Sequence, residues 1–264
     1  MICLLGTRGS IAVHGSVYAR YGGASACVLV RMGGEHILLD AGTGIMAAQA
    51  AAGDAKRFTV LLSHAHIDHM LGLPMFPPLH DRRYEADIYA RRRAGLGAAA
   101  QVSLLVRPPL WPHTAEAFHE GVRIRDLPSS GFFIGPVRVD WMEGNHPGGC
   151  TVYRLTHGDA SLVYCTDFEH GDGHTERLLA FARGCGALIY DAEFSPAEYE
   201  EKQGFGHSTW EMGAEIGTRC GAGRVLLFHH DPGRTDAELE RVEKALREAY
   251  PGCSFARCGE EVPL

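Results

Sequence analysis

The segment 63–69, which reads Ser-His-Ala-His-Ile-Asp-His, constrains this chain more than any other and directly follows the apolar run 58–62. Imidazole nitrogens and carboxylate oxygens are the ligands that catalytic zinc binds at roughly 2.0 to 2.2 Å, whereas structural zinc sites often use thiolates. In an extended segment His64 and His66 point to the same side, and a turn that begins a helix would bring Asp68 and His69 beside them. A solvated His-rich turn is the alternative, and it does not explain four such residues together. The segment therefore predicts a catalytic metal site, with parts of two metal positions on one loop.

Polar residues of the same kinds follow three further apolar runs. These are 161–165 with Asp167, 187–190 with Asp191, and 224–228 with His229 and His230. In layered α/β folds the loops at the strand ends share one rim of the sheet, where binding groups converge. Another histidine, His146, lies in the loop 143–149, whose glycines permit a tight turn. We therefore expect one shared site to which the segment 63–69, the residues after these three runs and His146 all contribute.

Strand-like runs alternate with helical patterns in both halves of the chain. The expected strands are 2–5, 26–31, 36–40, 58–62, 87–90, 122–125, 137–142, 151–155, 161–165, 187–190, 224–228 and 253–256. The expected helices are 44–52, 94–106, 175–183, 208–220 and 236–250. Two of these helices begin with a capping-box pattern, one at Ser208 to Glu211 and one at Thr235 to Glu238. No Pro/Gly/Ser linker, repeat or low-complexity tract divides the chain, so residues 1–264 are expected to form a single domain.

Composition narrows the classes of partner and the compartment. Lys and Arg number 25 against 32 Asp and Glu, a balance that makes a long nucleic acid an improbable partner. The eight cysteines lack a Cys-x-x-Cys pair and several lie within apolar runs, so we expect buried reduced thiols and a cytoplasmic location. The start of the sequence lacks the pattern of a signal peptide, and no apolar run reaches about 18 residues, so no membrane span is expected.

The order of the candidate ligands resembles that of the metallo-β-lactamase-fold hydrolases. Their sequence signature is His-x-His-x-Asp-His, followed by a distant His, a bridging Asp and a late His. The resemblance implies a four-layer αββα sandwich, of the α+β or α/β class, that holds two divalent metals. The first metal would be bound by His64, His66 and His146, the second by Asp68, His69 and His230, and both by Asp167. His229 competes with His230 for the last place, and the match of 228–230 to the Phe-x-His of ribonuclease Z-like chains favours His230. Zinc is the favoured metal, with manganese and iron as alternatives.

Further segments are similar to one bacterial subgroup related to ribonuclease Z and to cyclic-nucleotide phosphodiesterases. They are 6–10, 21–23, 40–44, 146–149, 166–170, 206–209 and 228–232. Two positions depart from that subgroup: Ile67 stands where Trp is common, and Ala24-Ser25 where Asn-Thr is common. Neither position supplies a metal ligand, so the departures bear on pocket shape and substrate.

The resemblance implies hydrolysis by a hydroxide that bridges the two metals, and Asp68 belongs to this catalytic set. His207 lies in a motif similar to the His-Ser-Thr of ribonuclease Z-like proteins and is expected to protonate the leaving group, with Asp191 as its carboxylate partner. Its alternative role is a helix cap. Arg8 and Arg20 are expected to contact phosphate, and Trp111 to stack on a base.

These features favour a phosphodiesterase for a small phosphodiester such as a cyclic nucleotide or dinucleotide. A lactonase or thioesterase would use the same ligands on a carbonyl carbon and stays open. A ribonuclease Z-like tRNA 3′-processing endonuclease would need a basic, glycine-rich arm that the sequence lacks. A metal-holding protein without turnover would be expected to lack one or more ligands. Dimers are common on this fold, so the resemblance also allows a homodimer.

Overall fold

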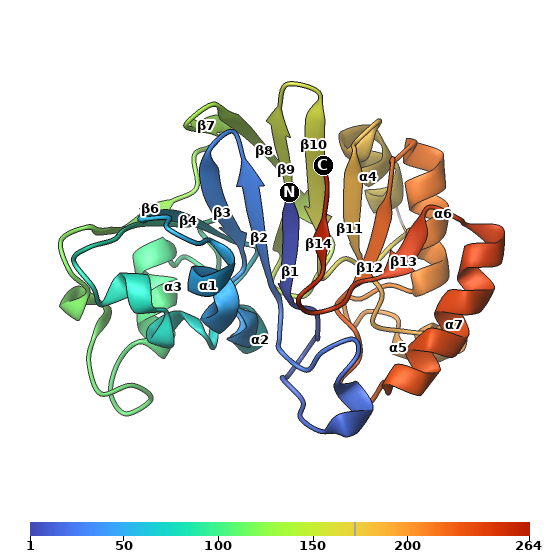
Figure 1. Cartoon of the computed structure of the whole chain (residues 1–264), viewed down its shortest axis with the longest axis horizontal. Coiled ribbons are helices and arrows are strands. Elements are labelled where there is room, and N and C mark those ends of the chain that lie inside the picture. Colours follow the sequence, from blue (N-terminus) through green and yellow to red (C-terminus); the bar gives the residue numbers. More distant parts are fainter. Residues whose placement is uncertain (172) are drawn as a thin grey trace.

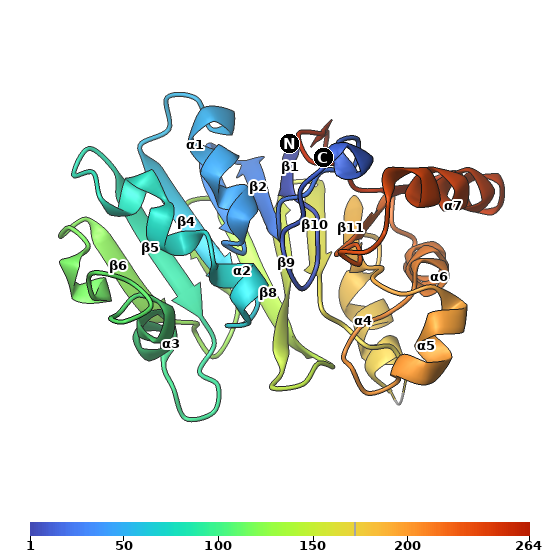
Figure 2. The same cartoon turned by 90° about the horizontal axis from the view of Figure 1, so that it is seen from below.

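The computed structural model describes residues 1–171 and 173–264, and it has four layers (Figure 1). Two seven-stranded sheets pack face to face, with α1, α2 and α3 outside one sheet and α4 to α7 outside the other. Figure 2 shows the same layers from below. The predicted αββα sandwich is therefore confirmed.

The first sheet is built mainly from the N-terminal half of the chain, and its strand order is β14-β1-β2-β3-β4-β5-β6. Its strands are β1 (Ile2–Gly6), β2 (Cys27–Met32), β3 (Glu35–Leu39), β4 (Arg57–Leu62), β5 (Glu85–Ala90), β6 (Val122–Asp126) and β14 (Glu261–Val262). Strands β3 to β6 are parallel, so their C-terminal ends lie at one edge. The helices beside this sheet are α1 (Ala48–Ala51), α2 (Ile67–Met70) and α3 (Ala98–Leu105).

The second sheet has the order β13-β12-β11-β10-β9-β8-β7. Its strands are β7 (Phe132–Ile134), β8 (Val137–Gly144), β9 (Cys150–His157), β10 (Ala160–Cys165), β11 (Ala187–Asp191), β12 (Val225–Phe228) and β13 (Cys253–Phe255). Strands β10 to β13 are parallel, so the residues after β10, β11 and β12 share one edge. Its helices are α4 (His174–Ala182), α5 (Pro196–Lys202), α6 (Trp210–Cys220) and α7 (Asp236–Ala249).

Strand β4 shows how the sandwich buries both faces of a sheet. Phe58, Val60 and Leu62 belong to the core beneath the helices, whereas Leu61 belongs to the core between the sheets. Successive strand residues point to opposite faces, so a strand covered on both sides reads as a continuous apolar run. This is why β4 was recognisable from sequence, and why the polar segment after it begins at the sheet edge.

The predicted helices lie where the sequence placed them, but the residues at which they begin and end differ. The helix expected from 94 begins at Ala98, because Ala94 and Gly95 adopt positive φ angles of 47° and 79° and form a turn. The helix expected over 44–52 is a 3₁₀ helix (Thr43–Ala47) followed by the short α1.

The two predicted capping boxes have different outcomes. The box at Thr235 and Glu238 is present and begins α7. At α6 the cap is Thr209, whose hydroxyl accepts a hydrogen bond from Met212 N, whereas Ser208 bonds Tyr190 and His170 instead. A third box, Ser195 with Glu198 at the start of α5, was not predicted.

The eight cysteines are unpaired, and seven of them are buried, as the sequence predicted for reduced thiols. Among the described residues no helix combines the length and apolar character needed to cross a bilayer.

Candidate metal centre

The polar residues that follow four strands meet at one edge of the sandwich. His64 follows β4, His146 lies between β8 and β9, Asp167 follows β10, and His229 follows β12. Asp167 and His229 have positive φ angles, 52° and 61°, which non-glycine residues seldom adopt and which turn their side chains out of the strand direction. The expectation that separate strand exits build one site is met.

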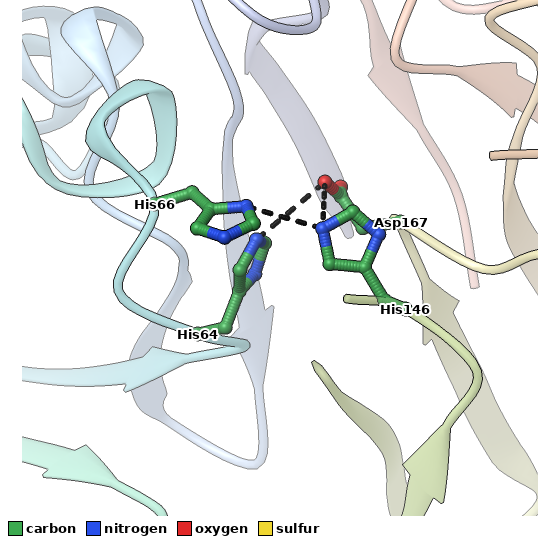
Figure 3. Close-up of side chains that lie close together, drawn as sticks. All are labelled: His64, His66, His146 and Asp167. Atoms are coloured by element: carbon green, nitrogen blue, oxygen red, sulfur yellow. Dashed lines mark hydrogen bonds and ion pairs between the residues drawn. The ribbon is translucent and has the colours of Figure 1, made fainter. Parts of the chain in front are cut away.

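His64, His66 and His146 surround one oxygen of Asp167, and we call these four residues the first cluster (Figure 3). The Oδ2 atom of Asp167 lies 3.6 Å from His64 Nε2 and 3.7 Å from His146 Nε2. His66 Nδ1 lies 3.1 Å from His146 Nε2. His66 is a solvent-exposed residue, so the first cluster is open on that side.

Asp68, His69 and His229 gather around the other oxygen of Asp167, and we call them the second cluster. The Oδ1 atom of Asp167 lies 3.2 Å from His69 Nε2 and 3.2 Å from His229 Nε2. Asp68 Oδ2 lies 3.1 Å from His69 Nε2 and 3.2 Å from His229 Nε2. One carboxylate therefore faces both clusters, one oxygen to each.

The donor atoms of these clusters fit divalent cations. Ligands bound tetrahedrally at about 2.1 Å lie roughly 3.4 Å apart, close to the separations observed. The Nε2 atoms of His64 and His69 are buried, and neither makes a hydrogen bond of good geometry, although the carboxylate oxygens of Asp167 lie near both. Leaving a buried polar atom unpaired is costly, and a cation between the ligands would remove that cost. The His and Asp clusters are thus suited to divalent metal ions.

The electrostatics differ between the two clusters, because the second cluster has more carboxylates around its imidazoles. Burial, reinforced by neighbouring imidazoles, holds the pKa of His64 well below its usual value, so this ring is neutral. Burial raises the pKa of Asp167, but His229, His69 and His64 outweigh it and lower that pKa well below its usual range. Burial lowers the pKa of His69 and His229 too, but Asp167 and the neighbouring carboxylates outweigh it and raise both well above the usual value, so a cation entering the second cluster would displace their protons.

Each Nδ1 atom that points away from the clusters meets an acceptor in the protein. His69 Nδ1 lies 2.7 Å from Asp40 Oδ2, His146 Nδ1 lies 2.8 Å from Gly206 O, and His229 Nδ1 lies 3.0 Å from Glu193 Oε2. Such contacts fix the ring orientation and tautomer of metal-binding histidines.

Asp40 is further fixed by three donors: the backbone N–H and hydroxyl of Ser63, at 2.6 and 2.8 Å, and the hydroxyl of Tyr164, at 2.8 Å. Asp40 and Glu193 were not predicted as site residues. Both are carboxylates at or near strand ends, which was the available signal, but their partners come from distant parts of the chain.

His207 and Asp191 are brought together beside the clusters. His207 Nδ1 lies 2.8 Å from Asp191 Oδ2, and the His207 ring stacks on His229 with centroids 5.0 Å apart. Burial lowers the pKa of His207, but Asp191, Asp167 and Glu193 outweigh it and raise that pKa to about 9. His207 is therefore protonated at neutral pH and is not the cap of α6, a role taken by Thr209.

The choice of His230 as the last ligand is corrected by the structure. His230 Nε2 bonds Ala256 O at 2.8 Å, and its ring packs edge-on against Tyr21 and Phe255. Burial lowers the pKa of His230 to about 3. The adjacent His229 occupies the second cluster, because its positive φ turns it to the site while His230 turns into the core.

The three expected substrate contacts are also not placed at the clusters. Arg8 is 0% exposed, and its guanidinium donates to the backbone carbonyls of Gly22, Asp231 and Arg234, so it ties loops together and cannot contact phosphate. Arg20 pairs with Glu240 of α7 on the surface. Trp111 packs against the core beside the first sheet.

The His229 assignment gives a direct prediction. Replacing His229 with Ala should remove one of two bound cations, because the second cluster loses a ligand. Replacing His230 with Gln, which keeps a donor for Ala256 O, should leave the metal content unchanged. Elemental analysis of both purified variants after dialysis measures this, and the reverse pattern would restore His230 as the ligand.

A cavity of about 820 Å³ adjoins the first cluster, and His146 lies in its wall. The lining residues are Asn145, His146, Pro147, Glu169, His170, Gly171, Tyr199, Gln203 and Gly204. A volume of this size matches that of pockets that bind small molecules. A smaller hollow of about 170 Å³ is lined mainly by apolar side chains, among them Ala65 and Ile67, the two neighbours of His66 in the sequence.

Known proteins resemble this chain in sequence and in fold. A family model described as a beta-lactamase superfamily domain matches residues 35–230. A ribonuclease Z from Bradyrhizobium sp. (strain ORS 278) is 27% identical over 289 residues, which cover 90% of this chain and 92% of that protein. The solved structure of the metallo-beta-lactamase fold protein YhfI from Bacillus subtilis is similar to this chain, with a TM-score of 0.74 and 19% sequence identity. The match covers 98% of this chain and 96% of the YhfI chain. A diphosphatase from the PhnP family has a TM-score of 0.75 at 18% identity, with 100% of this chain and 97% of that chain covered.

Proposed function

This chain belongs to the beta-lactamase superfamily and is a metal-dependent hydrolase, and we propose that it is a dinuclear phosphodiesterase acting on a small phosphodiester such as a cyclic nucleotide or dinucleotide. The observation that carries this proposal is the placement of Asp167, whose two carboxylate oxygens face two separate ligand clusters. Zinc is the proposed metal because the ligands are imidazole nitrogens and carboxylate oxygens, with manganese and iron as alternatives.

Two cations bound there would lower the pKa of a water molecule enough to supply hydroxide near neutral pH and would neutralise charge developing on phosphorus. The chain's own residues set the geometry of that chemistry. Asp167 fixes the distance between the clusters, and Asp40 and Glu193 hold the rings of His69 and His229 in place. Such preorganisation means that little reorganisation is needed when the substrate reacts.

His207 supplies the proton that the leaving alkoxide needs. Its Nδ1 is held by Asp191, so Nε2 is the ring nitrogen left to face the substrate. The carboxylates of Asp191, Asp167 and Glu193 raise the pKa of His207 to about 9, which favours the protonated form that a general acid requires. The side chain also lies against the rings of His229 and His146, hence at the mouth of both clusters.

Size and charge support a small substrate over tRNA. The net charge is −7, and the arginines near the first cluster are already paired, as Arg93 and Arg91 are with Glu143. A protein that grips a long phosphate backbone does so with many free cationic groups. The 820 Å³ cavity beside His146 has room for a nucleotide-sized molecule. Relatives named ribonuclease Z and diphosphatase are consistent with attack at phosphorus.

An ester or thioester hydrolase is the second candidate, and one observation favours it. Apart from Gln101, the side chains that line the 170 Å³ hollow are apolar, and one of them, Ile67, is 61% exposed. Such a surface suits an acyl chain better than a sugar phosphate, because buried polar groups of the substrate would find few partners there.

A paired assay decides between the two candidates. The metal-loaded protein should hydrolyse bis(p-nitrophenyl) phosphate, and it should do so faster than an N-acyl homoserine lactone at equal concentration, with kcat/KM as the measure. The metal-stripped protein is the control and should be inactive on both. Lactone turnover without any phosphodiester turnover would replace the first candidate by the second.

A further inference from the structure

Three imidazoles form a column that runs out of the second cluster. The rings of His69 and His229 stack with centroids 5.4 Å apart and planes inclined by 15°. His229 and His207 continue the stack, with centroids 5.0 Å apart and an inclination of 17°. The column therefore joins two candidate ligands to the proton donor.

Glu193 is the residue that touches two members of this column at once. Its Oε2 atom lies 3.0 Å from His229 Nδ1 and 3.3 Å from His207 Nδ1. Glu193 is 6% exposed, so water does not compete strongly for this oxygen. Glu193 accepts the hydrogen bond of His229 Nδ1, whereas His207 Nδ1–H donates to Asp191 and meets Glu193 in an ion-pair contact.

The carboxylate of Glu193 is itself held in place. Its Oε1 atom accepts a hydrogen bond from Ser10 Oγ at 3.2 Å. The neighbouring Gly9 lies so close to His229 that a Cβ built on it would be 2.3 Å from His229 Nδ1. The loop after β1 thus encloses His229 and Glu193 together, and a change in the position of one would displace the other.

Asp191, two residues earlier, differs in its contacts. Its Oδ2 atom accepts from His207 and from Phe168 N, and its Oδ1 atom accepts from Glu193 N and Ser208 N. His207 is the histidine that donates a hydrogen bond to Asp191. Asp191 and Glu193 therefore offer a matched pair of carboxylates, of which only Glu193 also supports a candidate ligand.

We propose that Glu193 is a positioning residue that couples cation binding at the second cluster to the placement of the His207 proton donor. The proposal rests on the proposed function in that it assigns His207 the donor role. A cation held by the second cluster would fix the ring of His229, whose Nδ1–H donates to Glu193, and Glu193 would in turn hold the oxygen that His207 contacts. Without the cation, His229 would be free to move, and the positions of Glu193 and His207 would change with it.

The test compares Glu193→Gln with Asp191→Asn and with Glu201→Gln, an exposed position on α5 that undergoes the same chemical change. Zinc affinity is measured by competition with a chelating dye. Glu193→Gln should bind one of its two ions about 10 to 100 times more weakly, the range found for residues that support metal ligands. Asp191→Asn and Glu201→Gln should keep both affinities.

The coupling itself is measured on His207 by NMR of its ring protons, which does not depend on turnover. In the wild type, removal of the weaker ion should shift the His207 resonance, and Glu193→Gln should show the shifted position even with both ions bound. Glu193→Gln and Asp191→Asn should also both slow substrates with poor leaving groups more than those with good ones. Glu201→Gln should match the wild type in every measurement.

Several outcomes would overturn the proposal. Unchanged zinc affinity in Glu193→Gln would show that Glu193 does not support cation binding. A His207 resonance that does not shift when the weaker ion is removed would show that the two sites are not coupled. If Glu193→Gln does not fold, Glu193→Asp keeps the charge on a shorter side chain, and wild-type behaviour of that variant would contradict a positional role. If the wild-type protein binds two ions but hydrolyses no phosphodiester, only the proposed function is refuted. The zinc-affinity and NMR measurements would still test the role of Glu193.

Discussion

Replacing Asp167 with Ala should strip both cations from the chain and lower hydrolytic activity by more than about a thousandfold, since metal ions supply several kcal/mol of transition-state stabilisation. Asp167 is the only one of the candidate ligands with an oxygen in each cluster, at 3.6 Å from His64 Nε2 and 3.2 Å from His69 Nε2. Its loss leaves each cluster with one ligand fewer and removes the negative charge between the cations. Elemental analysis and kcat/KM are the measurements.

The same change should abolish stabilisation by metal. A cation that binds only the folded state adds about 4 kcal/mol when its concentration is a thousand times the dissociation constant. The wild type should therefore lose several degrees in Tm when a chelator is added, whereas Asp167→Ala should melt at the same temperature with and without it.

Two controls separate the ligand effect from other causes. Asp167 has a φ of 52°, which Ala tolerates poorly and Asn tolerates well, so Asp167→Asn tests the lost charge without the added backbone strain. Asp159→Ala removes an exposed carboxylate in the turn between β9 and β10 and should keep the wild-type metal content. Two tightly held cations in either Asp167 variant would rule out the bridging role.

Replacing His207 with Ala should leave both cations in place and slow the cleavage of poor leaving groups by about 10²- to 10⁴-fold, the usual contribution of a general acid. His207 is held by Asp191 at 2.8 Å and is protonated at neutral pH, so it can donate to an alkoxide. A p-nitrophenolate leaving group is stable without a proton and should be slowed much less. The measurement is kcat/KM across a series of phosphodiesters that differ in leaving-group pKa.

The matched control is His80→Ala, which removes a histidine whose ring bonds Pro74 O away from the clusters. This variant should show the wild-type dependence on the leaving group. Equal slowing of good and poor leaving groups by His207→Ala would assign the side chain to substrate binding or structure instead. Loss of metal in His207→Ala would make it a ligand.

Much of the site was predictable because its first part is local in sequence. His64, His66, Asp68 and His69 lie on one loop after a buried strand, so the short-range geometry of a strand exit and a helix start already groups them. Asp167 and Asp191 were predictable for a related reason, since each follows an apolar run that can only be a strand covered on both faces. The αββα layers follow from the same alternation of strands and helices.

What the sequence determined by itself is therefore the set of chemical groups at the strand ends and the kind of ion they suit. Tertiary structure alone decided between His229 and His230, because the two are adjacent and a single positive φ angle at His229 sets which ring reaches Asp167 and which packs on Phe255. It likewise buried Arg8 beneath the loops and brought Asp40 and Glu193 behind the ligands. These outcomes depend on which side chains from distant segments fill the same space, and hydrophobic patterning along one segment does not carry that information.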